Sequence, residues 1–223
     1  IGQAVDNLKL DIIVEPRYFP VIGHWLARRY NQESIDELAS PLLGFDSYAW
    51  GGENLDIFQL EVPNSYLSKP LVLVAGENKT YTLYNDDGEA VLQGAVGEQV
   101  NNNGFTMQVK LLNARPETRF EVIKQRKLNT IIDYQQQLGA AERGKDSGII
   151  SLGLQHENPR YAINILNEVS RLYVRQNVER NSAEAAQSLE FLREQLPQVR
   201  KELERYEQAL NEYQTSTKSV DIT

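Results

Sequence analysis

The clearest pattern in the chain is a series of hydrophobic and aromatic positions spaced alternately three and four residues apart near its C-terminal end. We call this set the apolar seam: Leu189, Leu192, Leu196, Val199, Leu203, Tyr206, Leu210 and Tyr213. The spacing is the heptad pattern of a helix that packs against another helix along one narrow stripe. Charged residues occupy most positions between, so the other faces are solvated. Because such a helix needs a partner to be stable, we expect another helix to cover the seam.

The helix that carries the seam is expected to begin at Asn158 and Pro159, which suit an N-cap and a first helical position, and to run to about Tyr213. Its length would be roughly 80 Å, more than the width of a domain of this size, so its distal part should project. Pro197 lies inside the seam and predicts a kink. The first part carries a broader apolar face that is able to cover a sheet: Ala162, Ile165, Leu166, Val169, Leu172 and Tyr173.

Between residues 55 and 124 the hydrophobic pattern changes to a period of two, which is typical of strands. Short strands separated by turn residues favour a mainly antiparallel sheet. Two turns stand out, Asn85 to Gly88 and Asn101 to Gly104, because Asp-Gly and Asn-Gly supply the positive φ angles of a tight turn. The strands are expected at 57–62, 71–75, 80–84, 90–93, 105–112 and 119–124.

The remaining segments add helices and two further strands. We expect a helix end at 4–10, a strand at 11–15, a short amphipathic helix at 21–30, an irregular loop at 31–54, a helix at 128–138, a connecting loop at 139–145 and a nearly apolar central strand at 148–154. The predicted class is therefore α/β, more specifically α+β, with a mainly antiparallel sheet packed with helices and one long protruding C-terminal helix. Residues 1–157 would form a sheet-and-helix base domain, and 158–223 the helix that covers the base and then becomes a projecting arm.

Composition narrows the classes of protein that fit. The chain has 223 residues, of which 41% are hydrophobic and 24% charged, which is typical of a folded domain with an extension. With 31 acidic against 23 basic residues and a formal charge of −8, a nucleic-acid partner is disfavoured. The absence of cysteine leaves the redox compartment open. No apolar run is long enough to span a bilayer and Ile1 does not open a signal peptide, so we do not expect this chain itself to enter a membrane. Because no second helix follows the apolar seam, we expect its partner upstream, in another copy or in a missing part, and we interpret the chain as an excised piece of a longer protein.

Candidate catalytic motifs are weak. Residues 139–145 (GAAERGK) match the start of a phosphate-binding loop, but Asp146 replaces the Ser or Thr that would bind magnesium, and the expected order of helix and strand is reversed. His24 and His156 are the only histidines and lack metal-ligand spacing, and no G-x-S-x-G element is present. A carboxylate pair for sugar hydrolysis stays open, because only spatial separation decides it. We predict no catalytic, cofactor or metal site in this chain.

Aromatic residues in the β-rich region leave a different function open. Alternating strand aromatics are usually core residues or cross-strand pairs, but they are also able to stack on sugars. A carbohydrate-binding module is therefore one alternative, and a periplasmic secretion adaptor, which also combines a β-domain with long helices, is another. The aromatics concerned are Trp25, Tyr48, Trp50, Tyr66, Tyr81 and Tyr84.

Four stretches carry a resemblance to a known family. They are residues 10–20 (LDIIVEPRYFP), 144–150 (GKDSGII), 176–185 (QNVERNSAEA) and 188–200 (SLEFLREQLPQVR), the last with its internal proline. Together they resemble the periplasmic domain of bacterial polysaccharide co-polymerases, of the chain-length-determinant type joined to tyrosine autokinases. The resemblance covers most of the chain and is weakest over residues 31–54. Its motifs are structural, so it names no catalytic residue.

The resemblance implies a non-catalytic scaffold on the periplasmic side of a bacterial inner-membrane protein. Relatives of this type form ring-shaped homo-oligomers and help to set the length and export of capsular polysaccharide or exopolysaccharide. A polysaccharide polymerase and an outer-membrane exporter are the implied partners, and direct contact with polysaccharide stays possible. ATP and magnesium are implied only for a cytoplasmic kinase domain that is absent here. The residues expected to pack the helical arm are Leu189, Leu192, Leu196, Pro197, Val199, Leu203, Tyr206 and Leu210.

Overall fold

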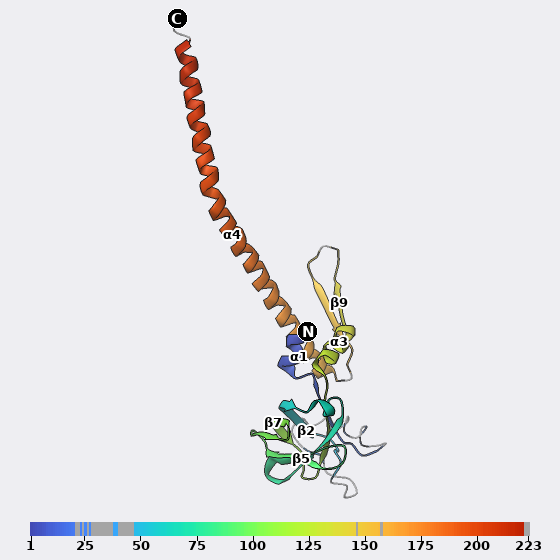
Figure 1. Cartoon of the computed structure of the whole chain (residues 1–223). Coiled ribbons are helices and arrows are strands. Elements are labelled where there is room, and N and C mark those ends of the chain that lie inside the picture. The colour runs from blue at the N-terminus through green and yellow to red at the C-terminus, as the bar shows by residue number, and fades with distance from the viewer. Residues whose placement is uncertain are drawn as a thin grey trace. The chain divides into compact units, whose positions relative to one another are not determined.

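The structure is a computed structural model that describes residues 1–20, 23, 25, 27, 38–39, 47–145, 147–156 and 158–220, with side chains described up to residue 216. Two short 3-10 helices, Asn64–Tyr66 and Glu77–Lys79, lie in connections. The helices and strands of these residues (Figure 1) are α1 (Gly2–Leu8), β1 (Ile12–Pro16), β2 (Asn54–Glu61), β3 (Pro70–Ala75), β4 (Thr80–Tyr84), β5 (Ala90–Ala95), β6 (Gln99–Asn102), β7 (Phe105–Asn113), β8 (Arg119–Lys124), α3 (Lys127–Gln137), β9 (Leu138–Glu142), β10 (Ile150–Leu154) and α4 (Pro159–Val220).

Two antiparallel sheets form the β-rich region, as the period-two pattern predicted. One has five strands in the order β1-β8-β3-β4-β5, and the other has three in the order β2-β7-β6. Strand β6 was not predicted, because its sequence, Gln99 to Asn102, has no alternation of apolar and polar residues. It forms because the following turn folds it back onto β7, where Val100 pairs with Met107. The predicted α+β class with a mainly antiparallel sheet is confirmed.

Both predicted turns are confirmed, each by its own chemistry. In the first, the Asn85 side-chain oxygen accepts hydrogen bonds from the backbone N–H groups of Asp87, at 3.1 Å, and Glu89, at 2.8 Å. Gly88 adopts a φ of 79°, which an L side chain rarely tolerates. In the second, Asn103 and Gly104 have φ angles of 47° and 83° and join β6 to β7. Asx chemistry and positive φ thus set the two hairpins.

The hydrophobic core draws on both sheets. Phe120 on β8 lies opposite Leu73 on β3, and both are fully buried. From the smaller sheet, Met107 and Val109 on β7 are equally buried and belong to the same cluster. This core is what the alternation of apolar and polar residues encodes, since every second residue of a strand faces the same side.

The strand predicted over residues 148–154 is confirmed as β10, but its predicted central position in a sheet is wrong. Strand β10 pairs with β9 in a separate two-stranded ribbon (Figure 1), and within the described part of the chain no further strand joins it. Most of its residues are exposed. The loop predicted over 139–145 is likewise partly wrong, since α3 ends at Gln137 and β9 begins at once. A short apolar run fits a buried strand and an exposed ribbon equally well, and only the pairing partner distinguishes them.

Helix α4 is one continuous helix of 62 residues, which corresponds to about 93 Å. Its predicted start is confirmed: the Asn158 side-chain oxygen accepts hydrogen bonds from the N–H groups of Arg160, at 3.0 Å, and Tyr161, at 3.2 Å. The helix continues through Pro197 without interruption. The chain divides into two compact units, Ile1–Glu168 and Val169–Thr223, so the first turns of α4 group with the base.

Two predicted elements lie largely outside the described residues. Of the helix expected at 21–30, only Gly23, Trp25 and Ala27 are described, and these three are helical. The loop expected at 31–54 is described at 38–39 and from residue 47 onward. There, Ala49 forms an isolated parallel bridge with Tyr18, which attaches this segment to the end of β1.

Candidate interaction surface

The start of α4 is held in the base by polar contacts among three helices. Asp6 on α1 lies 2.6 Å from the ammonium group of Lys127 on α3. Asn7 on α1 donates a hydrogen bond to Glu168 on α4 at 2.7 Å. The hydroxyls of Tyr134 on α3 and Tyr161 on α4 are hydrogen-bonded to each other. Each of the three helices is thus tied to the other two.

Tyr161 is the most perturbed titratable group in this cluster. Burial raises its pKa far above the ordinary value, and the neighbouring Tyr134 and Asp11 raise it further because they also disfavour the phenolate. Burial also raises the pKa of Tyr134 above its ordinary value. Both hydroxyls are therefore neutral at physiological pH and act as hydrogen-bonding groups that join α3 to α4, which is a structural role.

A second buried polar contact organises the segment before β2. Arg115 pairs with Glu53 at 2.9 Å, and the Glu53 side chain is only 1% exposed. The same carboxylate accepts hydrogen bonds from the backbone N–H groups of Trp50, at 3.0 Å, and Gly51, at 2.7 Å, while Arg115 also donates to the carbonyl of Ala39. Every polar contact of Glu53 thus serves to hold this segment against the end of β7.

The aromatic residues considered for sugar stacking do not form one exposed platform. Trp50 and Tyr81 are 3% and 2% exposed, so neither presents a ring face to a ligand. Trp50 stacks on Phe19 with ring centroids 5.5 Å apart. Tyr66 packs on Phe105 at 5.0 Å. These rings are core and packing residues, which is the more common role of aromatics in sheets.

The chemistry-bearing motifs also have structural roles. Residues 139–145 form most of β9 and the beginning of a turn that leads to β10, whereas a phosphate-binding loop opens a helix. The His156 Nδ1 accepts a hydrogen bond from the N–H of Asn158 at 3.0 Å. His24 lies outside the described residues. Among the residues that the structure describes, no group of three or more histidine and acidic side chains is arranged to hold a metal ion.

The apolar seam of α4 is exposed along its whole length. The exposed fractions of its eight residues run from 52% at Leu192 to 70% at Tyr206, and Pro197 is exposed as well. Burying apolar side chains against a partner is favourable, by about 25 cal/mol for each Å² of apolar surface removed from water. The structure brings all the predicted packing residues onto one helix, and each of them is exposed.

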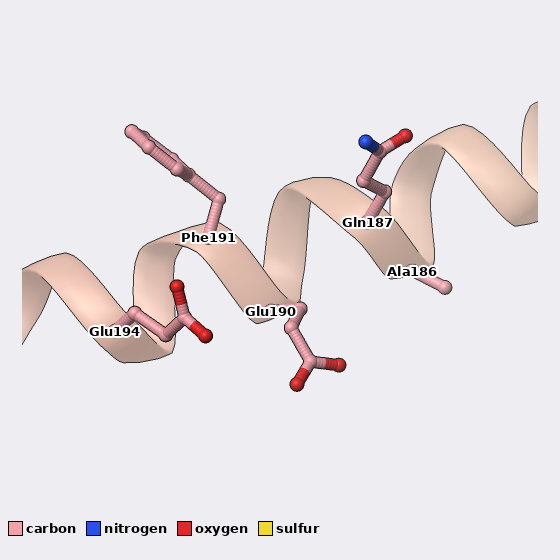
Figure 2. Close-up of a pocket in the computed structure, with 5 residues that line it drawn as sticks. All are labelled: Ala186, Gln187, Glu190, Phe191 and Glu194. Carbon is pink, nitrogen blue, oxygen red and sulfur yellow. The ribbon is translucent and has the colours of Figure 1, made fainter.

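A second apolar spot on α4 was missed by the sequence reasoning. Five side chains of this one helix line a shallow hollow around Phe191, which is 60% exposed: Ala186, Gln187, Glu190, Phe191 and Glu194. In Figure 2, Phe191 and Gln187 point to one side of the helix, and Ala186 and Glu190 point to the other. Phe191 falls two positions after Leu189 and so lies off the heptad seam. Its signal in the sequence is an aromatic residue at a position where the heptad calls for a polar one.

No helix in the described ranges is long and apolar enough to cross a bilayer. Among the described residues, most of the exposed large apolar side chains lie on α4; the others are Trp25, Phe58, Leu111, Leu128, Ile132, Ile149 and Ile150. Exposed apolar side chains at heptad spacing on one helix form a surface suited to helix packing.

Comparisons with known proteins identify the family of the chain. Residues 12–125, just over half of the chain, match the family model described as "Tyrosine-protein kinase Wzc, N-terminal domain". The chain belongs to this family, which confirms the resemblance to tyrosine autokinases of the Wzc type. The matched residues run from β1 to the end of β8, so the family is defined mainly by the two sheets.

Curated relatives match the chain from end to end. It is 37% identical over 228 residues to "Putative tyrosine-protein kinase EpsB" of Ralstonia solanacearum. It is 34% identical to "Tyrosine-protein kinase etk" of Escherichia coli K12, over 222 residues, and 33% identical to "Tyrosine-protein kinase wzc" of Salmonella typhimurium LT2. In each case all of this chain is covered, but it spans only 28–30% of the relative's length.

Proposed function

We propose that this chain is a non-catalytic scaffold domain of a polysaccharide co-polymerase with an attached tyrosine kinase. It would lie on the periplasmic side of the bacterial inner membrane, as the family resemblance implies. The observation that carries the proposal is the apolar seam on α4, where each of the eight apolar side chains is more than half exposed. Membership of the Wzc N-terminal domain family supports it.

In this proposal the domain acts through geometry. Contacts along α4 between copies, and with further helices of the parent protein, build a ring-shaped homo-oligomer. Assembly and disassembly of that ring would bring cytoplasmic kinase tails together for phosphorylation in trans. The kinase tails, with ATP and magnesium, would belong to the remaining 70% or so of a protein the size of the EpsB relative, of which this chain spans 30%.

The periplasmic surface would meet the polysaccharide polymerase and the outer-membrane exporter, and thereby influence the length and export of capsular polysaccharide or exopolysaccharide. The buried state of Trp50 and Tyr81 argues against an aromatic sugar platform in the base. The scaffold proposal is therefore preferred to a carbohydrate-binding module.

The test is a pair of charges placed in the seam of the intact protein. Leu196→Asp with Leu203→Asp puts two carboxylates where a partner helix would pack, and burying an unpaired charge is strongly unfavourable. We expect fewer cross-linked oligomers from native membranes and less exported polymer. The matched control, Gln198→Asp with Gln208→Asp, adds the same charge away from the seam and should change neither. Normal assembly and export in the seam variant would contradict the proposal.

A further inference from the structure

Strands β2 and β7 of the smaller sheet (Figure 1) pair through two β-bulges. Phe58 is skipped in the register on β2, and Lys110 is skipped on β7. At each bulge two consecutive residues lie on the side away from the core: Phe58, which is 53% exposed, with Gln59, and Lys110 with Leu111, which is 45% exposed. Bulges re-aim side chains and are over-represented next to active sites. The outer side of this sheet is therefore a candidate binding surface.

Three glutamines form one row across the outer side of the sheet. Gln59 on β2 pairs with Gln108 on β7, and Gln108 pairs with Gln99 on β6. Paired residues of neighbouring strands lie on the same side, so the three side chains are neighbours. We call this side of the sheet the glutamine face. The row that follows it is also polar and consists of Glu61, Thr106 and Asn101.

Hydrogen bonds within the protein orient the amide groups of the row. Gln59 donates to the carboxylate of Glu61 at 2.9 Å and accepts from Gln99 at 3.5 Å. Gln108 donates to the carbonyl of Gly97 at 3.2 Å. A side-chain amide has two N–H donors and an oxygen with two lone pairs, so among the described residues these contacts use only part of its capacity. The row presents donors and acceptors side by side, already oriented for a ligand.

The charges on the glutamine face balance one another. Lys110 pairs with Asp56 at 2.9 Å. The ammonium group of Lys9 lies 5.9 Å from the centre of the Phe58 ring. With Glu61, the described face has two cations and two carboxylates and thus no net charge. Electrostatic complementarity therefore selects neither an anionic nor a cationic partner, and an uncharged ligand fits best.

The chemistry of the face matches that of a sugar chain. Sugar hydroxyls donate and accept hydrogen bonds as side-chain amides do, and the C–H side of a sugar ring packs on an exposed aromatic ring. A protein interface has an apolar centre depleted of charged residues, whereas amides occupy the middle of this face and Phe58 and Leu111 lie at its bulged end. The glutamine row spans two strand spacings, or about 10 Å, which is the length of a disaccharide.

We propose that the glutamine face binds a saccharide chain. Phe58 stacks on one sugar ring, and the three glutamines form hydrogen bonds with hydroxyls of the neighbouring units. This inference rests on the function proposed above, since that role brings an exported polysaccharide to the domain, and it names the face that contacts the polymer. The aromatic residues considered for sugar stacking from the sequence are not part of the site, so the burial of Trp50 and Tyr81 does not bear on it.

Equilibrium dialysis of the full-length protein in lipid nanodiscs tests the site. The probe is labelled oligosaccharide released by mild acid from the polymer that the producing cells export. We expect saturable binding, which Phe58→Ala weakens about five-fold through loss of a stacked ring and Gln108→Met weakens about three-fold through loss of hydrogen bonds. The control variants Leu128→Ala and Gln93→Met change an exposed apolar residue and an exposed glutamine elsewhere in the base and should bind like the parent.

Three results would overturn the saccharide site. One is the absence of saturable binding, and another is equal affinity in Phe58→Ala and Leu128→Ala. The third is loss of a copurified protein from Phe58→Ala with oligosaccharide binding unchanged, which would assign the face to a protein partner. Raising the salt concentration from about 0.05 M to about 0.5 M should change the affinity by less than about two-fold, because the face has no net charge. Binding that disappears in high salt would contradict this form of recognition.

The same measurement separates this site from the scaffold role. The seam variant Leu196→Asp with Leu203→Asp should bind the oligosaccharide like the parent, because both changes lie on α4. Weaker binding in Phe58→Ala together with intact oligomers in the seam variant would support the saccharide site and contradict the role of the seam. Unchanged binding in Phe58→Ala together with fewer oligomers in the seam variant would overturn the saccharide site alone.

Discussion

The base and the distal part of α4 contain similar hydrophobic residues in opposite environments. In the base, Tyr81, Phe120 and Leu73 are at most 2% exposed and belong to one core. On α4, Leu196, Leu203 and Tyr206 are 64%, 56% and 70% exposed. The apolar side chains of the base therefore pack against one another within the chain, whereas those of the apolar seam on α4 are exposed. The same residue types serve folding in the base and, in the function proposed above, association on α4.

The largest expected effect is in the core of the base. Phe120→Ala removes a fully buried ring and should lower the free energy of unfolding by about 3–5 kcal/mol. Leu203→Ala on the seam should change it by no more than about 0.5 kcal/mol, as is usual for exposed sites. Chemical denaturation followed by circular dichroism measures both. A large loss from Leu203→Ala would break the comparison, because it would show that the seam is already covered.

The next effect concerns buried and exposed ion pairs within the base. Arg115→Met leaves the carboxylate of Glu53, which is 1% exposed, without its cation and should cost about 3 kcal/mol of unfolding free energy. The control is Lys110→Met, whose partner Asp56 is 2.9 Å away in an exposed pair, and it should cost at most about 1 kcal/mol. Equal losses in the two variants would show that the segment around Glu53 does not depend on this contact.

A smaller effect is expected where α4 joins the base. Tyr161→Phe removes the hydroxyl that bonds Tyr134 and should cost about 1 kcal/mol near pH 8. The control Tyr206→Phe changes a residue that is 70% exposed and should have no effect at that pH.

The same tyrosine predicts a pH dependence. The folded state raises the pKa of Tyr161 above its ordinary value of 10.0, so above pH 10 the unfolded chain loses a proton that the folded chain keeps. The unfolded state then binds fewer protons, and stability falls as the pH rises through about 10. Tyr18, Tyr81 and Tyr134 shift in the same direction. The midpoint temperature of thermal unfolding should fall less steeply between pH 8 and 12 in Tyr161→Phe than in the parent protein. An unchanged slope would contradict this role of Tyr161.

The smallest expected effect is that of seam substitutions on the stability of the base, and it tests directly whether the base and the seam are independent. Leu196→Asp with Leu203→Asp should leave the free energy of unfolding of the base within about 0.5 kcal/mol of the parent, because neither side chain is buried in this chain. Hydrogen exchange of the β3 and β8 amides reports the base alone. A measurable loss of protection there would mean that the seam and the base form one cooperative unit.

Sequence reasoning succeeded where local chemistry and periodicity agree. The hairpin at Asn85 to Gly88, the N-cap at Asn158 and the antiparallel strands between 54 and 124 other than β6 were predicted. It failed at β10, where the apolar residues Ile149 to Leu154 suggested a buried strand, and at β6, where polar residues hid one. In both cases the deciding factor was which strand lies alongside, which is a nonlocal property.

Sequence reasoning also identified some residues of the candidate surface and missed others. The heptad spacing identified every seam residue, because a period of 3.5 places those side chains on one stripe of any helix. The heptad spacing did not identify Phe191, because this residue belongs to no repeat. Only the structure shows that its ring is exposed. The polar contacts of Glu53 and Tyr161 were equally invisible, since their partners lie 62 and 27 positions away in the sequence.

By itself, the sequence determined the α+β class, the turn positions, the long helix with its seam and the family, because each depends on residues close together in the chain or on a repeated pattern. Only the tertiary structure decided which strands pair, that most of the apolar run at 149–154 is exposed, that Trp50 and Tyr81 are buried, and that the ring of Phe191 is exposed. Burial is a property of the neighbours that a fold assembles, and those neighbours come from distant parts of the chain.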